Sequence, residues 1–465
     1  MSESENKTGM DVTESHEPSS SSSGHHSHHH SHHHHHSSHH HHHHHSHHSR
    51  HRSSSQRSKG KRERQRQAFR QFFRKNRKKI AILAIAVLFC FCSIAAGAFI
   101  DRVVLWDDSK GENTSWVVDG QVYVSVSVFD QPISLMNTAT KALLDAPVST
   151  EVIDIYREYK GAENRLDTGV SVKLSYAVTA APAGYVVNEA VFLVAEDEQM
   201  TNPLRIVPEW GEDTVECYNL KVATTYYYRL NLTFTNGVQT AVLGSFTTDE
   251  GPRVMTVSGA YNMRDVGGWT TKNGQRVRQG LLYRGCEMDG AVENRYRLDE
   301  NGKSVMLTQL NIKTDMDLRT DTEITGNANV LGGNVQHTYY NMVMYSDVFR
   351  DENAEVVRKV FADLANPAQY PAYLHCTYGQ DRTGTVCYLL GALLGVDEAD
   401  LMKDYRLSGL HHGYVAPEDM SAFVRRIKEL PAVTLQEKVE GYLLDVGVTE
   451  QQINSIRTIF LEDVK

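Results

Sequence analysis

Runs of apolar and polar residues divide this chain of 465 residues into segments with different expected structures. Residues 170–179 and 226–234 alternate apolar and polar side chains, a pattern typical of strands with one buried face. Asn236 and Gly237 follow the second run and predict a hairpin turn, because both residue types tolerate positive φ. Residues 166–250 are therefore expected to form an all-β sandwich domain.

The remainder of the chain reads differently on either side of this region. Upstream, residues 101–165 contain one expected strand at 122–129 and an expected helical stretch at 143–159, without a clear domain assignment. Downstream, a Gly-Pro linker at 251–252 precedes residues 253–465, where strand-like and helix-like runs alternate. That alternation predicts a multidomain protein whose C-terminal domain has an α/β fold.

An uncharged apolar run covers residues 80–100 and is long enough to cross a bilayer as one helix. Basic residues crowd residues 70–79, whereas three aspartates follow the run by residue 108. The positive-inside rule then predicts a single-pass protein of a bacterial cell membrane, with a cytoplasmic N-terminus and residues 101–465 outside the cell. The alternative is a cleaved signal peptide, because Ala96-Gly-Ala98 resembles a cleavage site.

The N-terminal tail, residues 1–79, is expected to be disordered, since Ser and His dominate its first 60 residues and little there is apolar. Twenty histidines lie between His25 and His51, so the tail is either a solvated segment or a loose ligand for divalent transition metals. No spacing predicts a closed metal site or a bound cofactor, and His411-His412 lacks a third ligand at matching spacing. The tail carries a charge of +9 and the rest −18, which argues against nucleic-acid binding by the folded part.

The strongest chemical signal lies at Cys376, between an expected buried strand and an expected apolar helix at 385–394. Such a strand-to-helix turn aims backbone N–H groups at one point and suits a bound phosphate. Five residues separate Cys376 from Arg382, so the loop can curl around one tetrahedral anion, while Gly379 relieves the tight curve and Gly384 lets the helix approach. A helix N-terminus and a neighbouring arginine favour the thiolate that a nucleophilic cysteine needs. The guanidinium of Arg382 can grip two phosphate oxygens at once.

Residues 375–384, HCTYGQDRTG, resemble the signature of the protein-tyrosine phosphatase superfamily, in the version found in bacterial tyrosine/serine phosphatases related to lipid phosphatases. Further stretches are similar to motifs of that family in family order: NMRDVGG at 262–268, GLLYRG at 280–285, DMDLRTDTE at 315–323, DYRLS at 404–408 and YLLDVGV at 442–448. The resemblance covers residues 255–465.

This resemblance implies roles for individual residues. Cys376 would be the nucleophile, Arg382 the clamp on the transition state and Asp381 the general acid, with Asp265 as the alternative acid. The phosphate-binding loop would further comprise Thr377, Tyr378, Gly379, Gln380, Thr383 and Gly384, and the supporting residues would be His375, Asp317, Arg319, Asp265 and Arg264. Many relatives have lysine at the position of Gln380 and a small residue at that of Tyr378, a departure that argues against activity on phosphoinositides.

Residues 166–250 resemble a fibronectin type III module, in the placement of Leu220, Tyr226 and Tyr228 and in the terminal SFTT at 245–248. Together the two resemblances imply a membrane-anchored, cysteine-dependent phosphatase that acts on phosphorylated proteins or small phosphoesters without a cofactor. The alternative is a catalytically weak phosphate-binding protein, or an adhesion or scaffold protein that acts through the sandwich.

Overall fold

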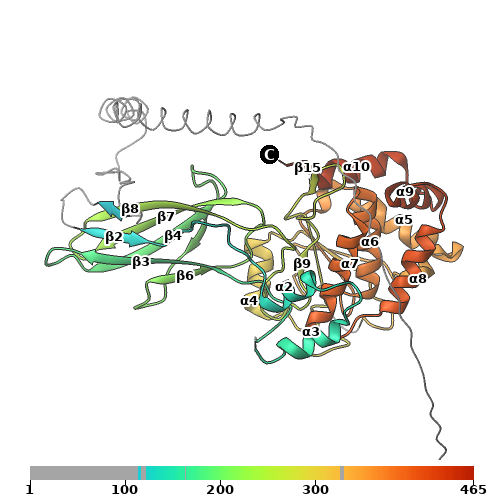
Figure 1. Ribbon diagram of the computed structural model, residues 1–465, viewed down its shortest axis with the longest axis horizontal. Helices are drawn as coiled ribbons and strands as arrows, with labels where there is room; N and C mark the ends of the chain where they lie inside the picture. Colours follow the sequence, from blue (N-terminus) through green and yellow to red (C-terminus); the bar gives the residue numbers. More distant parts are fainter. Residues whose placement is uncertain (1–113, 117–121, 163, 325–328, 465) are drawn as a thin grey trace, which may run out of the picture. The chain divides into compact units, whose positions relative to one another are not determined.

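The computed structural model describes residues 114–116, 122–162, 164–324 and 329–464 (Figure 1). Among these residues, no helix combines the length and the apolar composition that a bilayer crossing requires. The expected membrane helix at 80–100 and the expected disordered tail lie outside the described residues.

Two antiparallel four-stranded sheets form the first half of the described chain. Their strand orders are β1-β2-β3-β6 and β5-β4-β7-β8. The strands are β1 (Thr114–Trp116), β2 (Tyr123–Val126), β3 (Val172–Ala180), β4 (Val187–Ala195), β5 (Leu204–Ile206), β6 (Thr214–Cys217), β7 (Thr225–Phe234) and β8 (Gln239–Thr247). Strand β2 precedes residue 166, so the β region begins earlier than the sequence suggested.

Side chains from both sheets fill one apolar core, as expected for a sandwich. Leu174 of one sheet and Leu230 of the other are fully buried in it, and the Tyr228 hydroxyl donates to the Ser127 carbonyl at 2.6 Å. The predicted hairpin is present between β7 and β8, where Gly237 has a φ of +85°. Membership of the fibronectin type III family stays a prediction.

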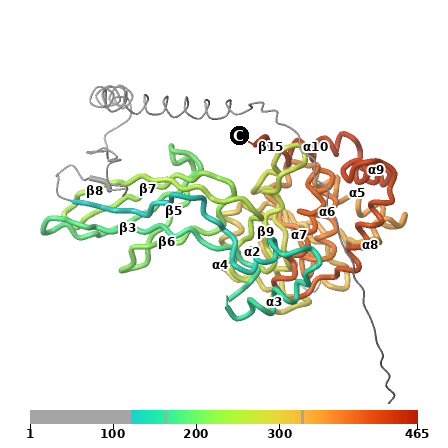
Figure 2. The backbone as a smooth tube through the Cα atoms, in the orientation of Figure 1, coloured from blue at the N-terminus to red at the C-terminus, as the bar shows by residue number. Residues whose placement is uncertain are grey.

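Two helices leave the sandwich between β2 and β3 and pack on the other half of the chain. They are α2 (Thr138–Asp145) and α3 (Val152–Tyr159), which lie near α7 (Glu398–Leu407) in the backbone trace (Figure 2). Their buried apolar residues belong to the same core as those of α5–α10. The sequence predicted one helical stretch across residues 143–159. Pro147 explains the interruption, because proline disfavours a helical conformation at the residue before it. Ala146 accordingly has an extended backbone.

The C-terminal half is built on a five-stranded sheet of order β13-β12-β14-β11-β9, in which only β9 runs antiparallel. Leu374 of β14 faces the core formed with the C-terminal helices, whereas Tyr373 faces a second core that includes Met306. The predicted α/β fold of this region is therefore confirmed. The sheet strands are β9 (Arg264–Asp265), β11 (Leu282–Gly285), β12 (Thr314–Asp317), β13 (Gln336–Tyr339) and β14 (Ala372–His375).

The remaining elements surround this sheet. A separate ribbon pairs β10 (Gln275–Val277) with β15 (Leu461–Asp463). The helices are α4 (Glu300–Ser304), α5 (Ala354–Leu364), α6 (Asp381–Leu394), α7 (Glu398–Leu407), α8 (Pro417–Lys428), α9 (Leu435–Asp445) and α10 (Glu450–Phe460). Short 3₁₀ segments are η3 (Tyr345–Phe349), η4 (Asp351–Asn353), η5 (Pro367–Gln369) and η6 (Ser408–His411), and η2 (Val305–Gln309) is a π-helix.

Candidate active site

Cys376 lies directly after the central strand β14, and the loop that follows it ends at the N-terminus of α6. The backbone N–H groups of residues 377–383 donate no hydrogen bond to any described residue. Free N–H groups at a helix N-terminus form an anion-binding site. The predicted strand, loop and helix are thus all present, and the loop retains its donors for a ligand.

Gly379 is required by the shape of this loop. Its φ is +62°, and a Cβ atom there would lie 2.3 Å from the carbonyl carbon of Gly285. Gly384 meets the ring of Tyr405, which would lie 3.1 Å from an added Cβ atom. Gly379 therefore supplies the left-handed conformation that the tight curve of the loop needs, and Gly384 allows α6 to pack closely against Tyr405.

Positive charges surround the Cys376 thiol, which is 1% exposed. Arg382 and Arg284 both interact electrostatically with it. His375, the residue before it, is buried; burial alone would lower its pKa, but the carboxylates of Asp317 and Asp315 raise the pKa of His375 to about 9. The imidazole is therefore protonated at neutral pH, which adds to the positive field around the thiol.

Glu323 holds the guanidinium of Arg382. Its two carboxylate oxygens accept hydrogen bonds from Nη1 and Nη2 of Arg382, and Oε1 also accepts from the Thr377 hydroxyl at 2.7 Å. These donors hold the pKa of Glu323 well below its usual range, against the opposing effect of burial. Nε of Arg382 and the Thr383 hydroxyl are buried without a partner among the described residues, so both remain available to a bound oxyanion.

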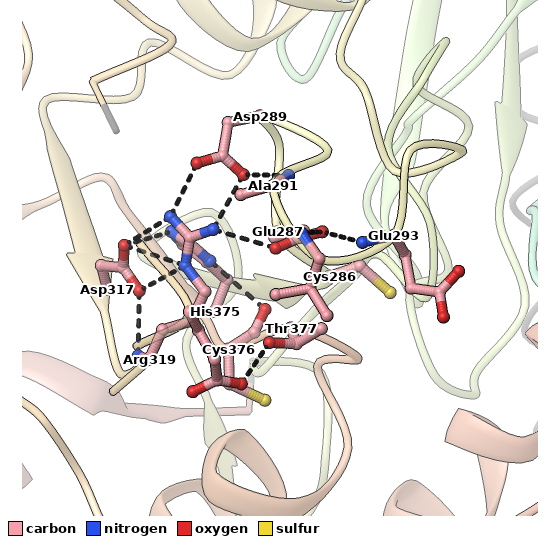
Figure 3. A network of polar contacts seen from close by, with 12 residues as sticks. Cys286, Glu287, Asp289, Ala291, Glu293, Asp317, Arg319, His375, Cys376 and Thr377 are labelled. Carbon is pink, nitrogen blue, oxygen red and sulfur yellow. Dashed lines mark hydrogen bonds and ion pairs between the residues drawn. The ribbon is translucent and has the colours of Figure 1, made fainter. Parts of the chain in front are cut away.

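Arg319 supports the first residues of the loop through a network of buried carboxylates (Figure 3). Its fully buried guanidinium donates to Asp317, to Glu287 at 2.9 Å and to Asp289 at 2.8 Å. The backbone N–H of Glu287 in turn donates to the carbonyl of Thr377 at 3.0 Å. Asp317 and Arg319 therefore lie beside the loop at the carboxyl end of β12, as predicted.

A second buried network holds the middle of the loop. Asp404 of α7 binds both Arg264 and Arg284, with N–O distances of 2.7 and 2.5 Å. Arg284 donates to the carbonyl of Gly379 at 2.9 Å, and the Asn262 side chain donates to the carbonyl of Tyr378 at 2.9 Å. Loop carbonyls are thus engaged from outside, which turns the N–H groups of the same peptides inward.

Asp381 begins α6 and lines a cavity of about 520 Å³ beside the loop. Its Oδ1 accepts hydrogen bonds from the Tyr345 hydroxyl and from Nε2 of Gln380. The cavity is walled largely by aromatic and polar side chains, among them Tyr345, Tyr378, Gln380, His412 and Tyr414. A leaving group that extends from the loop would meet this wall and Asp381 together.

Asp265, the alternative general acid and a predicted supporting residue, lies elsewhere. Its carboxylate accepts from Arg253 at 2.7 Å and from the backbone N–H groups of Gly280 and Gly267 at 2.6 and 2.8 Å. It is 1% exposed and forms no hydrogen bond with residues 375–384. Asp265 therefore stabilises the segments around β9 and β11. Of the two candidate general acids, Asp381 is the one that lines the cavity.

Several residues of the site were not singled out from the sequence. Glu323, Asp404 and Asn262 all lie within the family-like motifs, so those motifs were the available signal. Tyr345 lies in none of them. His411 and His412 also lie near the cavity, where burial lowers the pKa of the first to about 3 and of the second to about 4, so both are neutral at pH 7.

Comparison with known proteins agrees with this geometry. Residues 255–462 match the sequence profile of the tyrosine phosphatase family. A tyrosine-protein phosphatase of Nostoc commune is 26% identical over 196 aligned residues, which cover 32% of this chain and 67% of that relative. The chain therefore contains a catalytic domain of the tyrosine phosphatase family, which makes it a hydrolase of the protein-tyrosine-phosphatase type.

Proposed function

We propose that the chain hydrolyses phosphate monoesters through a phospho-cysteine intermediate on Cys376. The convergence of a thiol, free backbone donors and Arg382 on one loop is the observation that carries this proposal. Phosphorylated tyrosine or serine and small phosphoesters all contain the group that this loop would bind. The aromatic side chains that line the adjacent cavity favour an aromatic leaving group.

The reaction would proceed in two displacements. In the first, the thiolate of Cys376 attacks phosphorus, the bond to the ester oxygen breaks, and Asp381 donates a proton to the departing oxygen. In the second, water attacks the phosphoryl group, Asp381 takes a proton from it, and the phosphorus–sulfur bond breaks. The Thr383 hydroxyl, which has no partner among the described residues, would then donate to the released thiolate.

Arg382 and the loop N–H groups would stabilise the charge that develops on the phosphoryl oxygens. Glu323 binds two nitrogens of the guanidinium and leaves Nε–H free, so Arg382 is oriented before the substrate arrives. Such preorganised donors lower the barrier because they need no reorganisation during the reaction. No step of the proposed reaction requires a metal or an organic cofactor.

A single substitution tests the covalent step. Cys376→Ser should abolish turnover of para-nitrophenyl phosphate while phosphate binding and the fold remain, because a hydroxyl does not ionise near neutral pH. Cys387→Ser is the matched control, since burial raises the pKa of the Cys387 thiol in the following helix α6 to about 11. Acid-quenched wild-type enzyme should carry a phosphoryl group on the Cys376 peptide. Cys376→Ser activity above about one part in a thousand of wild type would contradict covalent catalysis.

We also propose that residues 80–100 anchor the enzyme in the membrane, with residues 101–465 outside the cytoplasm and the sandwich acting as a fibronectin type III-like spacer or binding module. The apolar run and its flanking charges support the anchor. Membrane fractionation of the full-length chain and of a chain that starts at residue 101 tests it. The anchor requires that only the full-length chain resist a carbonate wash.

A further inference from the structure

The carboxylate of Asp381 is held by the protein through one of its two oxygens. Oδ1 accepts hydrogen bonds from the Tyr345 hydroxyl and, at 3.1 Å, from Nε2 of Gln380. Oδ2 accepts no hydrogen bond from any described residue, and the residue is partly exposed to the cavity. The two oxygens therefore have different surroundings, although the carboxyl group itself is symmetric.

Tyr345 reaches Asp381 from a strained position. Its φ is +50°, and this left-handed conformation is energetically unfavourable for any residue other than glycine. The backbone N–H of Tyr345 donates to the Thr385 hydroxyl at 2.8 Å, and this hydroxyl donates to the carbonyl of Asp381 at 2.8 Å. Backbone and side chain of Tyr345 thus both bind the N-terminal part of α6, which holds the hydroxyl against Oδ1.

A second tyrosine lies next to this hydrogen bond. The Tyr405 hydroxyl lies 2.8 Å from the Tyr345 hydroxyl, accepts from the backbone N–H of Ala416 at 3.1 Å and lies 3.2 Å from the carbonyl oxygen of Ala416. The Tyr405 proton can point at the Ala416 carbonyl or, over the shorter distance, at the Tyr345 hydroxyl, and in the second arrangement the Tyr345 proton points at Asp381. The groups then form a chain with one direction, from Ala416 N–H through two hydroxyls to Oδ1, and each donor strengthens the next.

We propose that Tyr345, supported by Tyr405, is the positioning residue that keeps Oδ1 of Asp381 as an acceptor and thereby places the transferable proton on Oδ2. This inference rests on the proposed role of Asp381 as general acid. In the protonated acid, Oδ1 is the carbonyl oxygen and accepts both hydrogen bonds, while Oδ2–H points into the cavity. When Oδ2–H gives its proton to the leaving oxygen, the same two donors remain on the carboxylate that forms.

The proposal predicts a dependence on the leaving group. Phenolate is a poor leaving group and needs the proton, whereas 2,4-dinitrophenolate leaves without one. For the full-length protein, Asp381→Asn should lower kcat/KM for phenyl phosphate at least about 100-fold. Tyr345→Phe should lower it about 10-fold, and Tyr405→Phe less. Each variant should change kcat/KM for 2,4-dinitrophenyl phosphate less than about 3-fold.

A double-mutant cycle separates this role from a structural one. Because Tyr345 would act only through the acid, Tyr345→Phe should change kcat/KM less than about 2-fold when it is added to Asp381→Asn. Tyr388→Phe is the matched control, since this tyrosine of α6 is buried and its hydroxyl has no partner among the described residues. Its kcat/KM should equal that of the wild type.

Each other outcome overturns a specific claim. If Tyr345→Phe lowers kcat/KM equally for both esters, or lowers it equally with and without Asp381, Tyr345 is structural and the inference is wrong. If Asp381→Asn itself shows no leaving-group dependence, the general acid of the proposed function is misassigned. Should Tyr345→Phe fail to fold, Tyr405→Phe is tested by the same two criteria, because the Tyr405 hydroxyl contacts Asp381 only through the Tyr345 hydroxyl.

Discussion

His375 should make the stability of the protein depend on pH through the neutral range. Its ring is 1% exposed, and Nε2 lies 3.0 Å from Oδ1 of Asp315 and 4.0 Å from Oδ2 of Asp317. The ring also stacks on Tyr373, with centroids 5.5 Å apart. Substitution of His375 by glutamine keeps a polar side chain of similar reach but removes the charge that these carboxylates stabilise.

The size and sign of the effect follow from the pKa of His375. Burial lowers that pKa, but the two aspartates outweigh burial and raise it from 6.5 to about 9 in the folded state. A difference of about 2.5 units corresponds to about 3 kcal/mol of folding stability. Because the folded-state pKa is raised, this contribution is complete below pH 6.5 and is lost as the pH rises from 6.5 through 9.

Urea unfolding of wild type and His375→Gln at pH 6, 7.5 and 9.5 measures this contribution. The difference between the two unfolding free energies cancels other titrating groups and should shrink from about 3 kcal/mol at pH 6 toward zero at pH 9.5. His411→Gln is the control: His411 is buried, but its pKa is lowered to about 3, chiefly by burial, so it is neutral throughout this range. A His375→Gln difference that stays constant with pH would refute the reasoning.

Three further substitutions or truncations test the site. Glu323→Gln should lower kcat/KM about 10- to 100-fold, mainly through kcat, because Arg382 loses a charge-assisted partner; an unchanged kcat/KM would contradict an orienting role. Asp265→Asn should destabilise the fold by about 3–5 kcal/mol, because Arg253 stays buried without its counter-charge, yet leave kcat of the folded enzyme within about 2-fold. A chain limited to residues 253–465 should unfold at lower urea concentration than the chain from residue 122, since it lacks α2 and α3; equal midpoints would show that these helices add nothing.

Local features of the site could be predicted from the sequence because they depend on near neighbours. A buried strand, a cysteine, a loop with two glycines and an apolar helix follow one another within about twenty residues. The left-handed φ of Gly379 and the fully buried interior of α6 agree with that prediction. Spacing along the chain fixes such features, because strand and helix geometry are set by the backbone itself.

The partners of the loop could not be predicted in the same way. Glu323 binds Arg382 across 59 residues of sequence. Tyr345 reaches Asp381 from a 3₁₀ segment that lies in none of the family-like motifs. Hydrophobic periodicity assigns a residue to a face but says nothing about which distant residue it meets there. The same limit explains Asp265, whose place in a family-like motif suggested a role at the loop although its partners lie on the other side of β11.

The dependence of the loop on an upstream segment shows why the family motifs alone do not describe the whole catalytic unit. Asp167, which lies between α3 and β3, accepts the backbone N–H of Asn262 at 2.7 Å and so supports its left-handed φ of +51°. The Asn262 side chain then donates to the carbonyl of Tyr378 in the phosphate loop. Beside it, Arg165 donates to the carbonyl of Ala260 at 2.7 Å. Residues that precede the matched region 255–462 thus support the loop through Asn262, so the matched region does not contain every residue on which the geometry of the site depends.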